Sequence, residues 1–370
     1  MKNLSKKSFI TGTIVGIVVT IIFSSFNIVN FNKKDSKSKE IDEIIKQHFL
    51  YNKDVDQDTS YKRQLSALGD EYSEYYDKKE FKAFLESTKG EFVGVGILFS
   101  QDPSTKTSTA VEVYENSPAE EAGIKAGDIL KEVNGEDVQK KDLSLTVKQI
   151  RGQENTKVTV TVLRNGQTIT KQLTRRKIEV QTIKSKIVHN NIGYIAITQF
   201  TEDTHTQFQK ALNDLESKNI KALIIDLRDN PGGLVSTTSS ILDTLLPAGN
   251  TVIIRDSKGK ENALKSDDKK VYTKPIAILV NENSASAAEL FTGAMQDYGK
   301  ATVIGTTTYG KGVVQQIFPL KDGSGIKLTV SEYFTPKKRP VHKKGITPDI
   351  NVVDKNEQLN TAIYILKSKI

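Results

Sequence analysis

The chain has 370 residues, more than a single compact core usually holds, so two or three domains are expected. Apolar residues make up 37% and charged residues 26%, which is typical of a folded globular protein. The absence of cysteine excludes disulfides, thiolate catalysis and cysteine-based metal sites. A net charge of +8 can indicate nucleic-acid binding, but the lysines are scattered and no aromatic residues alternate with them. We therefore interpret the charge as a lysine-rich solvated surface and expect no nucleic-acid partner.

An uncharged, apolar segment lies near the N-terminus. Residues 8–32 carry no charged side chain, and these 25 residues exceed the roughly 20 that a helix needs to span a bilayer. We expect an uncleaved transmembrane signal anchor, because no A-x-A-like cleavage site follows the apolar stretch. Lysines flank the segment on both sides, so the positive-inside rule does not decide its orientation. We adopt the usual signal-anchor arrangement, a single-pass protein of the cell membrane with the bulk of the chain on the extracytoplasmic side.

A helical region is expected over residues 36–90. Apolar residues recur at helical spacing near both of its ends, at Ile41, Ile44, Ile45 and Phe49 and again at Phe81, Phe84 and Leu85. Between these stretches lies Leu68-Gly69-Asp70, which is followed by several tyrosines. We interpret the region as a cap or an assembly element.

Residues 91–175 have a different sequence pattern, in which short apolar segments are separated by turns. Strands are expected over residues 92–99, 110–114, 129–133, 158–163 and 168–173. A short helix should begin at Ser117-Pro118, because serine caps helices and proline is tolerated in their first turn. A second helix is expected over 143–150, and Asn134-Gly135 is a strong hairpin signal.

This stretch resembles a PDZ domain. The run from Ser117 to Leu130 is its most recognisable segment, and a peptide-binding loop is indicated by Gly94, Val95, Gly96 and Ile97. In such a loop backbone N–H groups hold a terminal carboxylate, glycine permits close approach, and a neighbouring strand edge pairs with the peptide. The resemblance therefore implies a module that recognises the C-terminal tails of proteins.

From Ile192 onward strands and helices alternate. The continuous apolar runs Ala222–Leu227 and Ile276–Val280 are typical of strands buried on both faces. Helices are expected after Thr204, over 236–246 and over 287–296. This alternation predicts an α/β core within a multidomain α+β chain.

Two turns rich in small residues follow the two buried strands. One contains Gly232 and Gly233 and the other contains Ser286, and each precedes a helix, where open α/β sheets form their crevices. The amide of Ala287 would lie at a helix N-terminus, which favours developing negative charge, and an amide of Gly232 or Gly233 could complete an oxyanion hole. A single serine in this position is otherwise an ordinary helix cap.

A serine nucleophile needs a base, and Lys311 is the candidate. It lies between two glycines, and burial would lower the pKa of its amine so that the neutral form could accept a proton. Gln315 is four residues further on, so in an extended segment it shares the face of Lys311. A lone Gly-Lys-Gly is usually a solvated loop.

Together these segments resemble the carboxyl-terminal processing, or tail-specific, serine proteases. The resemblance rests on Asn230-Pro231-Gly232-Gly233, the run Ser284–Glu289, and Gly310-Lys311-Gly312 with Gln315. It implies that residues 176–370 form a crotonase-like α/β protease core with a C-terminal helix, preceded by an inserted PDZ domain. It also implies that Ser286 is the nucleophile of a Ser-Lys dyad, Lys311 the base, and Gln315 the support of the base.

The same resemblance carries expectations about regulation and partners. In the family the PDZ domain occludes the active site until it binds a substrate tail, and an arginine that maps to Arg151 couples the two. A surface arginine at a helix end is the alternative. We expect an endopeptidase acting on protein or peptide substrates with apolar C-termini, without metal or cofactor. Relatives form homodimers, which makes the helical flanks at 41–88 and 356–368 candidates for an interface.

Two functions of other kinds compete with this interpretation. A PDZ scaffold could hold a ligand without turnover, although a degenerate protease would be expected to have lost Ser286 or Lys311. A Ser-His-Asp hydrolase could use His205 or His342, although no motif typical of such a triad is present. A metalloprotease is disfavoured because the sequence has no H-E-x-x-H.

Overall fold

The computed structural model describes residues 57–267, 269 and 271–370. The predicted anchor at 8–32 and the first part of the helical region lie outside these residues and stay predictions. In the described part of the chain, no helix has both the length and the apolar character required to cross a bilayer.

The described N-terminal region contains α2 (Gln57–Ser66), the short strand β1 (Glu74–Tyr76) and α3 (Lys78–Lys89). Asp77 and Glu80 form a reciprocal capping box at the start of α3, and Gly90 ends the helix with a φ of 80°. The apolar face of α3 is buried through Phe81 and Phe84, which pack with Leu234 of the core. The helix expected from the spacing is therefore present, whereas the strand β1 was not predicted.

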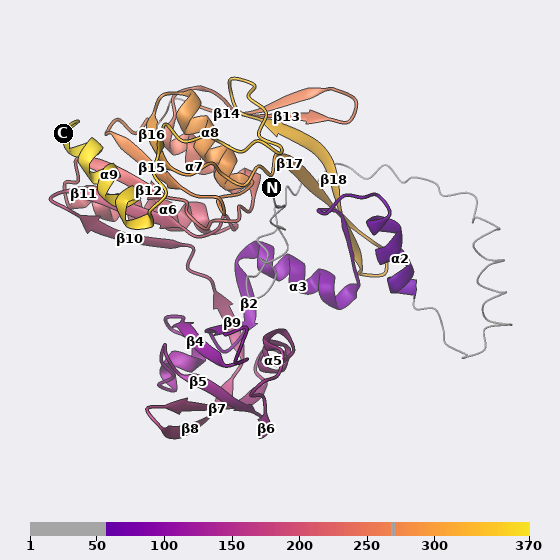
Figure 1. Cartoon of the computed structure of the whole chain (residues 1–370). Coiled ribbons are helices and arrows are strands. Elements are labelled where there is room, and N and C mark those ends of the chain that lie inside the picture. Colours follow the sequence, from indigo (N-terminus) through magenta and orange to yellow (C-terminus); the bar gives the residue numbers. More distant parts are fainter. Residues whose placement is uncertain (1–56, 268, 270) are drawn as a thin grey trace, which may run out of the picture.

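The PDZ module is a separate unit connected to the rest by a two-stranded ribbon (Figure 1). The ribbon pairs β2 (Glu91–Gly94) with β9 (Arg176–Glu179). The module's sheet has the order β3-β4-β5-β7-β8, with β6 paired to β5. Its elements are β3 (Ile97–Gln101), β4 (Ser108–Val113), α4 (Pro118–Glu121), β5 (Ile129–Val133), β6 (Glu136–Asp137), α5 (Leu143–Ile150), β7 (Lys157–Arg164) and β8 (Gln167–Thr174). The single strand expected over 92–99 is divided between β2 and β3, because Gly96 adopts a φ of 82°.

The core is built on a six-stranded sheet with the order β10-β11-β12-β15-β16-β19. The strands are β10 (Ile183–Val188), β11 (Ile192–Ile197), β12 (Ala222–Asp226), β15 (Ile276–Val280), β16 (Ala301–Gly305) and β19 (Ile350–Asn351). Only β10 runs antiparallel to its neighbour. The helices are α6 (Thr204–Ser217), α7 (Val235–Leu245), α8 (Ala287–Asp297) and α9 (Lys355–Lys367).

Helices cover both faces of this sheet, which explains the continuous apolar strands. In β12, Leu223 and Ile225 belong to the cluster that includes α6, α7 and α8, whereas Ala222 and Ile224 pack with α9. Successive side chains of a strand point to opposite faces, so a strand covered on both sides needs apolar residues at every position. The doubly covered parallel sheet confirms the α/β class of the core.

A second sheet brings distant segments together. It has the order β1-β18-β13-β14, and β17 also pairs with β18. Its members are β13 (Gly249–Asp256), β14 (Glu261–Ser266), β17 (Val313–Pro319) and β18 (Gly325–Phe334). Because β1 pairs with β18, the N-terminal region shares a sheet with the core, and residues near position 72 reach the strands that follow Lys311 (Figure 1).

Candidate active site

Ser286 lies between β15 and α8 in a strained backbone conformation. Its φ is 57° and its ψ is −113°, and its side chain is fully buried. A non-glycine residue in this region costs on the order of 1–3 kcal/mol, and such strain concentrates at functional sites. The Oγ atom has no hydrogen-bond partner among the described residues. Small neighbours, Ala285 and Ala287, permit the tight turn.

A buried carboxylate, Glu289, joins this turn to the segment that carries Lys311. It accepts hydrogen bonds from the backbone N–H groups of Ser286 at 2.7 Å, Gly310 at 2.6 Å and Lys311 at 2.8 Å. The Thr308 hydroxyl donates a fourth bond at 2.5 Å. Burial raises the pKa of Glu289, and these donors act against that rise. This role was not predicted from the sequence, although an acidic residue three positions after a serine is the signature of a capping box.

The predicted oxyanion hole contains two backbone N–H groups without a partner in the described part of the chain. One belongs to Ala287, at the N-terminus of α8. The other belongs to Gly233, since the N–H of Gly232 donates to Asn230 Oδ1 at 2.7 Å. Gly232 nevertheless lies directly against the site, because a Cβ there would be 2.9 Å from Ser286 Cβ and 3.0 Å from Ala287 N. The two glycines thus differ, because Gly232 lies closest to the serine turn and Gly233 has the free N–H in the described part of the chain.

Lys311 lies beside this turn with its amine over an aromatic ring. Its Nζ is 4.3 Å from the centroid of the Tyr72 ring. Burial, helped by the nearby ammonium of Lys327, lowers the pKa of Lys311 to about 8. Its backbone is held at both ends, by Glu289 at the N–H and by the Tyr333 hydroxyl at the carbonyl.

Gln315 is buried but has no hydrogen bond to Lys311. Its Nε2 donates to Thr329 Oγ1 at 3.0 Å, and its Oε1 has no partner in the described residues. The pairing of β17 with β18 shifts register between Val314 and Gln315, which alters the simple alternation of faces assumed from the sequence. The support of Lys311 by Gln315 stays a prediction.

Neither candidate histidine is bonded to Ser286, whose Oγ is unpartnered. His205 instead contacts Gln209, with 3.3 Å between its Nε2 and the Gln209 Nε2. The buried Nδ1 of His342 has no hydrogen-bond partner among residues 57–370 as far as the structure describes them. The described residues also contain no group of three acidic or histidine side chains placed to hold a metal ion.

The predicted peptide-binding loop, residues 94–97, joins β2 to β3. Among the described residues, no hydrogen bond uses the N–H of Val95 or Gly96. Strand β3 lies at an edge of its sheet, next to α5, so its outer side is open to pairing. Arg151 follows α5, and its guanidinium lies 5.0 Å from the centroid of the Phe92 ring, which belongs to β2 of the connecting ribbon.

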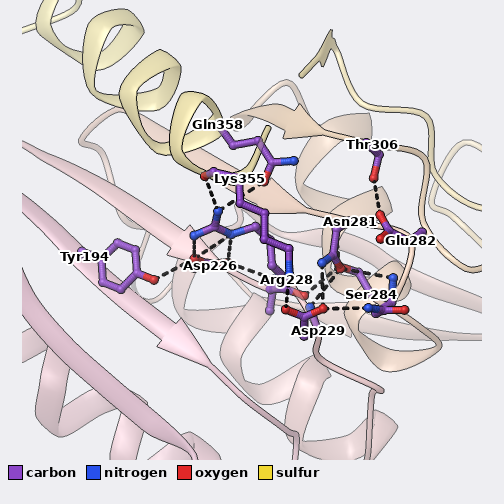
Figure 2. A network of polar contacts seen from close by, with 12 residues as sticks. Tyr194, Asp226, Arg228, Asp229, Asn281, Glu282, Ser284, Thr306, Lys355 and Gln358 are labelled. Carbon is purple, nitrogen blue, oxygen red and sulfur yellow. Dashed lines mark hydrogen bonds and ion pairs between the residues drawn. The ribbon is translucent and has the colours of Figure 1, made fainter. Parts of the chain in front are cut away.

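A polar network on the α9 side holds the loops that carry the glycines and Ser286 (Figure 2). Asp229, with a φ of 60°, accepts hydrogen bonds from the side-chain amides of Asn281 at 2.8 Å and Asn283 at 2.7 Å. Arg228 pairs with the buried Asp226 and donates to the carbonyl of Lys355 at 2.7 Å. The network thus ties the glycine turn both to the serine turn and to α9. None of these residues was singled out from the sequence.

The fold and the site define a serine peptidase with a PDZ domain. A family model described as "Peptidase family S41" matches residues 191–352, and a PDZ domain model matches residues 109–164. The chain is 36% identical over 367 residues to a "Probable CtpA-like serine protease" of Staphylococcus aureus, covering 95% of this chain and 73% of that protein. A protein of the same description from Staphylococcus saprophyticus is 35% identical over 363 residues, covering 94% and 73%.

A solved structure leads to the same family. The photosystem II D1 C-terminal processing protease superposes with a TM-score of 0.53 and 27% identity, covering 86% of this chain and 87% of that one. The chain belongs to peptidase family S41, together with the CtpA-like serine proteases. The predicted family and the predicted class of enzyme are confirmed.

Proposed function

We propose that this chain is an endopeptidase that cleaves proteins near their C-termini through a dyad of Ser286 and Lys311. The observation that carries the proposal is the shared anchor of the two residues. One buried carboxylate, Glu289, bonds the backbone N–H of both, so the strained serine turn and the lysine segment are held together. A lysine pKa of about 8 supports the role of base, because the neutral amine is then accessible near neutral pH.

The reaction divides into acylation and deacylation. In acylation the Lys311 amine takes the Ser286 hydroxyl proton as Oγ bonds to the scissile carbonyl carbon, and the N–H groups of Ala287 and Gly233 receive the oxyanion. The C–N bond then breaks, and the leaving amine takes the proton from Lys311. In deacylation water attacks the acyl group, Lys311 accepts its proton, and Ser286 Oγ recovers a proton as it leaves.

The structure supports an engagement of these groups that accompanies substrate binding. Ser286 Oγ and Gln315 Oε1 are both buried and have no hydrogen-bond partner in the described part of the chain, while the Lys311 amine lies over the Tyr72 ring. Hydrogen bonds of catalytic groups are often made only in the substrate complex. In the productive state the Lys311 amine would turn toward Ser286 Oγ, and Gln315 Oε1 would accept a hydrogen bond from the Lys311 amine.

Tail recognition is assigned to the PDZ module. The free N–H groups of Val95 and Gly96 would hold the terminal carboxylate, while the edge of β3 pairs with an apolar tail. Binding of the tail would gate the protease through the β2–β9 ribbon and Arg151, whose position on Phe92 is next to that loop. Arg151→Ala should lower tail-stimulated cleavage without changing the fold, and equal stimulation in both proteins would remove this role.

The cellular setting is also part of the proposal. Residues 8–32 would anchor the chain in the cell membrane, with the protease on the extracytoplasmic side and the helical flanks forming a homodimer. Alkaline extraction of membranes should leave the full chain in the pellet and release a form that lacks residues 8–32. Sedimentation of the purified chain measures the dimer directly.

The deciding experiment measures cleavage of an unfolded protein with an apolar C-terminus by the purified full chain. Wild type, Ser286→Ala and Lys311→Ala are compared, with a substrate whose C-terminal carboxylate is amidated as the control for tail recognition. Activity in the wild type alone supports the dyad. Activity that survives in either variant refutes it, and inactivity of all three would favour a binding protein.

A further inference from the structure

A segment outside both family matches reaches the candidate active site. Residues 68–76, here called the strap, connect α2 to α3, whereas the matched segments are 109–164 and 191–352. The strap ends in β1, which pairs antiparallel with β18, with Glu74 opposite Lys327. This pairing holds the strap against the strand that also pairs with the Gln315 segment.

The Tyr72 ring is the direct neighbour of the Lys311 amine. The centroid of the ring lies 4.3 Å from Nζ, within the range of a cation–π contact. The hydrogen bonds that the structure gives Lys311 are made by its backbone, whose N–H donates to Glu289 and whose carbonyl accepts from the Tyr333 hydroxyl. The carboxylates Asp70, Glu71 and Glu74 of the strap and the ammonium of Lys327 on β18 act on Lys311 only through the electric field, and Glu289 of α8 bonds its backbone.

A second contact ties the strap to Gln315. Ser73 Oγ accepts a hydrogen bond from the backbone N–H of Thr329 at 3.0 Å and donates to Asp70 at 2.5 Å. The Thr329 hydroxyl in turn accepts the hydrogen bond from Gln315 Nε2. The strap therefore bonds to Thr329, which bonds the side chain of Gln315, and the Tyr72 ring of the strap lies against the Lys311 amine.

We infer that Tyr72 is a positioning residue that holds the ammonium form of Lys311 against its ring through a cation–π contact. The inference rests on the proposed role of Lys311 as the base. An aromatic face attracts an ammonium and not a neutral amine, so the ring holds Lys311 in its protonated state. When the amine loses its proton the attraction ends, and the neutral base is released toward the unpartnered Oγ of Ser286.

The cation–π contact of Tyr72 should change the pH dependence of kcat/KM in a defined direction. The ring favours the charged form, so weakening it should lower the pKa of Lys311 and move the acid limb of kcat/KM to lower pH. From the usual range of cation–π strengths, a shift of about half a unit to one unit is expected. A ring that acted only as packing would leave the midpoint unchanged.

The test varies the ring while keeping its shape. Tyr72→Phe is prepared together with forms of Tyr72→Phe whose ring carries one, two or three fluorines, which withdraw electron density from the face. The full chain is assayed for kcat/KM from pH 5 to 10 (about the span needed to bracket the Lys311 midpoint). Tyr72→Leu is added as the form without a ring, and Tyr61→Leu removes a ring of the same region that contacts Tyr75 and not Lys311.

We expect the midpoint of the acid limb of kcat/KM to be unchanged in Tyr72→Phe and Tyr61→Leu. It should fall to lower pH with each fluorine added to the ring. A single midpoint across the fluorinated series would overturn the inference. If Lys311→Ala keeps its activity, the base assignment fails and this inference fails with it. If Lys311→Ala is inactive and the fluorinated forms all share one midpoint, the dyad stands and only the role of Tyr72 is refuted.

Discussion

Replacing Gly232 by alanine would place a methyl group between the glycine turn and the start of α8. The new Cβ would lie 2.8 Å from the Ala285 carbonyl oxygen, 2.9 Å from Ser286 Cβ and 3.0 Å from Ala287 N. Two of these neighbours are backbone atoms of the serine turn, so the turns must separate. The φ of 105° adds about 1–2 kcal/mol of strain for a residue with a side chain.

The catalytic effect follows from what the methyl group covers. It would occupy the approach to the Ala287 N–H, and loss of one oxyanion donor lowers kcat by about 10²–10³. We expect a decrease of this size in kcat for Gly232→Ala with a small change in KM. The assay is steady-state cleavage of the unfolded substrate, with urea unfolding to measure the loss of stability.

Gly299→Ala is the matched control, because Gly299 also has a positive φ, of 62°, and follows α8 at its far end. No atom lies within 4 Å of the Cβ that it would gain. This variant should lose stability through backbone strain and keep its kcat. If Gly232→Ala loses no more kcat than Gly299→Ala, the placement of the oxyanion hole against Gly232 is wrong.

Three other changes test the electrostatics of the site. Glu289→Gln replaces one acceptor oxygen by an amide that faces N–H and O–H donors, so we expect the free energy of unfolding to fall by about 3–5 kcal/mol and kcat to fall with it. Wild-type kcat/KM should rise about tenfold per pH unit below pH 8, because the neutral amine of Lys311 is required. Lys327→Met removes a neighbouring ammonium, so the pKa of Lys311 and the midpoint should rise, as a pH profile would measure. Arg228→Met leaves the carboxylate of Asp226, 7% exposed, without its ion pair and should cost about 3–5 kcal/mol in urea unfolding.

Two of these changes, Glu289→Gln and Arg228→Met, have a matched control. Glu282→Gln alters a more exposed carboxylate that has one hydroxyl donor, from Thr306, and should behave like wild type. Lys269→Met breaks a surface pair whose side chains are 84% and 45% exposed, and its cost should be near zero. Equal losses in a variant and its control would mean that burial has no part in the effect. A lower midpoint in Lys327→Met would contradict the repulsion between the two lysines.

Much of the candidate site could be predicted from local sequence patterns. The continuous apolar run Ala222–Leu227 predicts a strand buried on both faces, and the structure has β12 there between two helical layers. A turn of small residues before a helix predicts a tight turn at Ser286, and the structure gives this residue a φ of 57°, although the predicted exposure of its hydroxyl is wrong because the side chain is fully buried. These predictions succeed because backbone geometry and burial pattern depend on residues that are close in the chain.

The contacts that complete the site were not accessible in this way. Glu289 was passed over because its partners Gly310 and Lys311 lie some twenty positions away, and no local pattern states which N–H groups a carboxylate will meet. The choice between Gly232 and Gly233 depended on Asn230, whose side chain occupies one N–H and leaves the other free.

The sequence by itself determined the buried strands β12 and β15 and the helices that follow them, the position of the serine and lysine turns and the family to which the chain belongs. Only the tertiary structure decided that β1 pairs with β18 and places Tyr72 against the Lys311 amine. The physical reason is that strand pairing across some 250 residues leaves no periodicity in either segment. It is selected by the packing of the whole core, and so are the side chains that the pairing brings to the base.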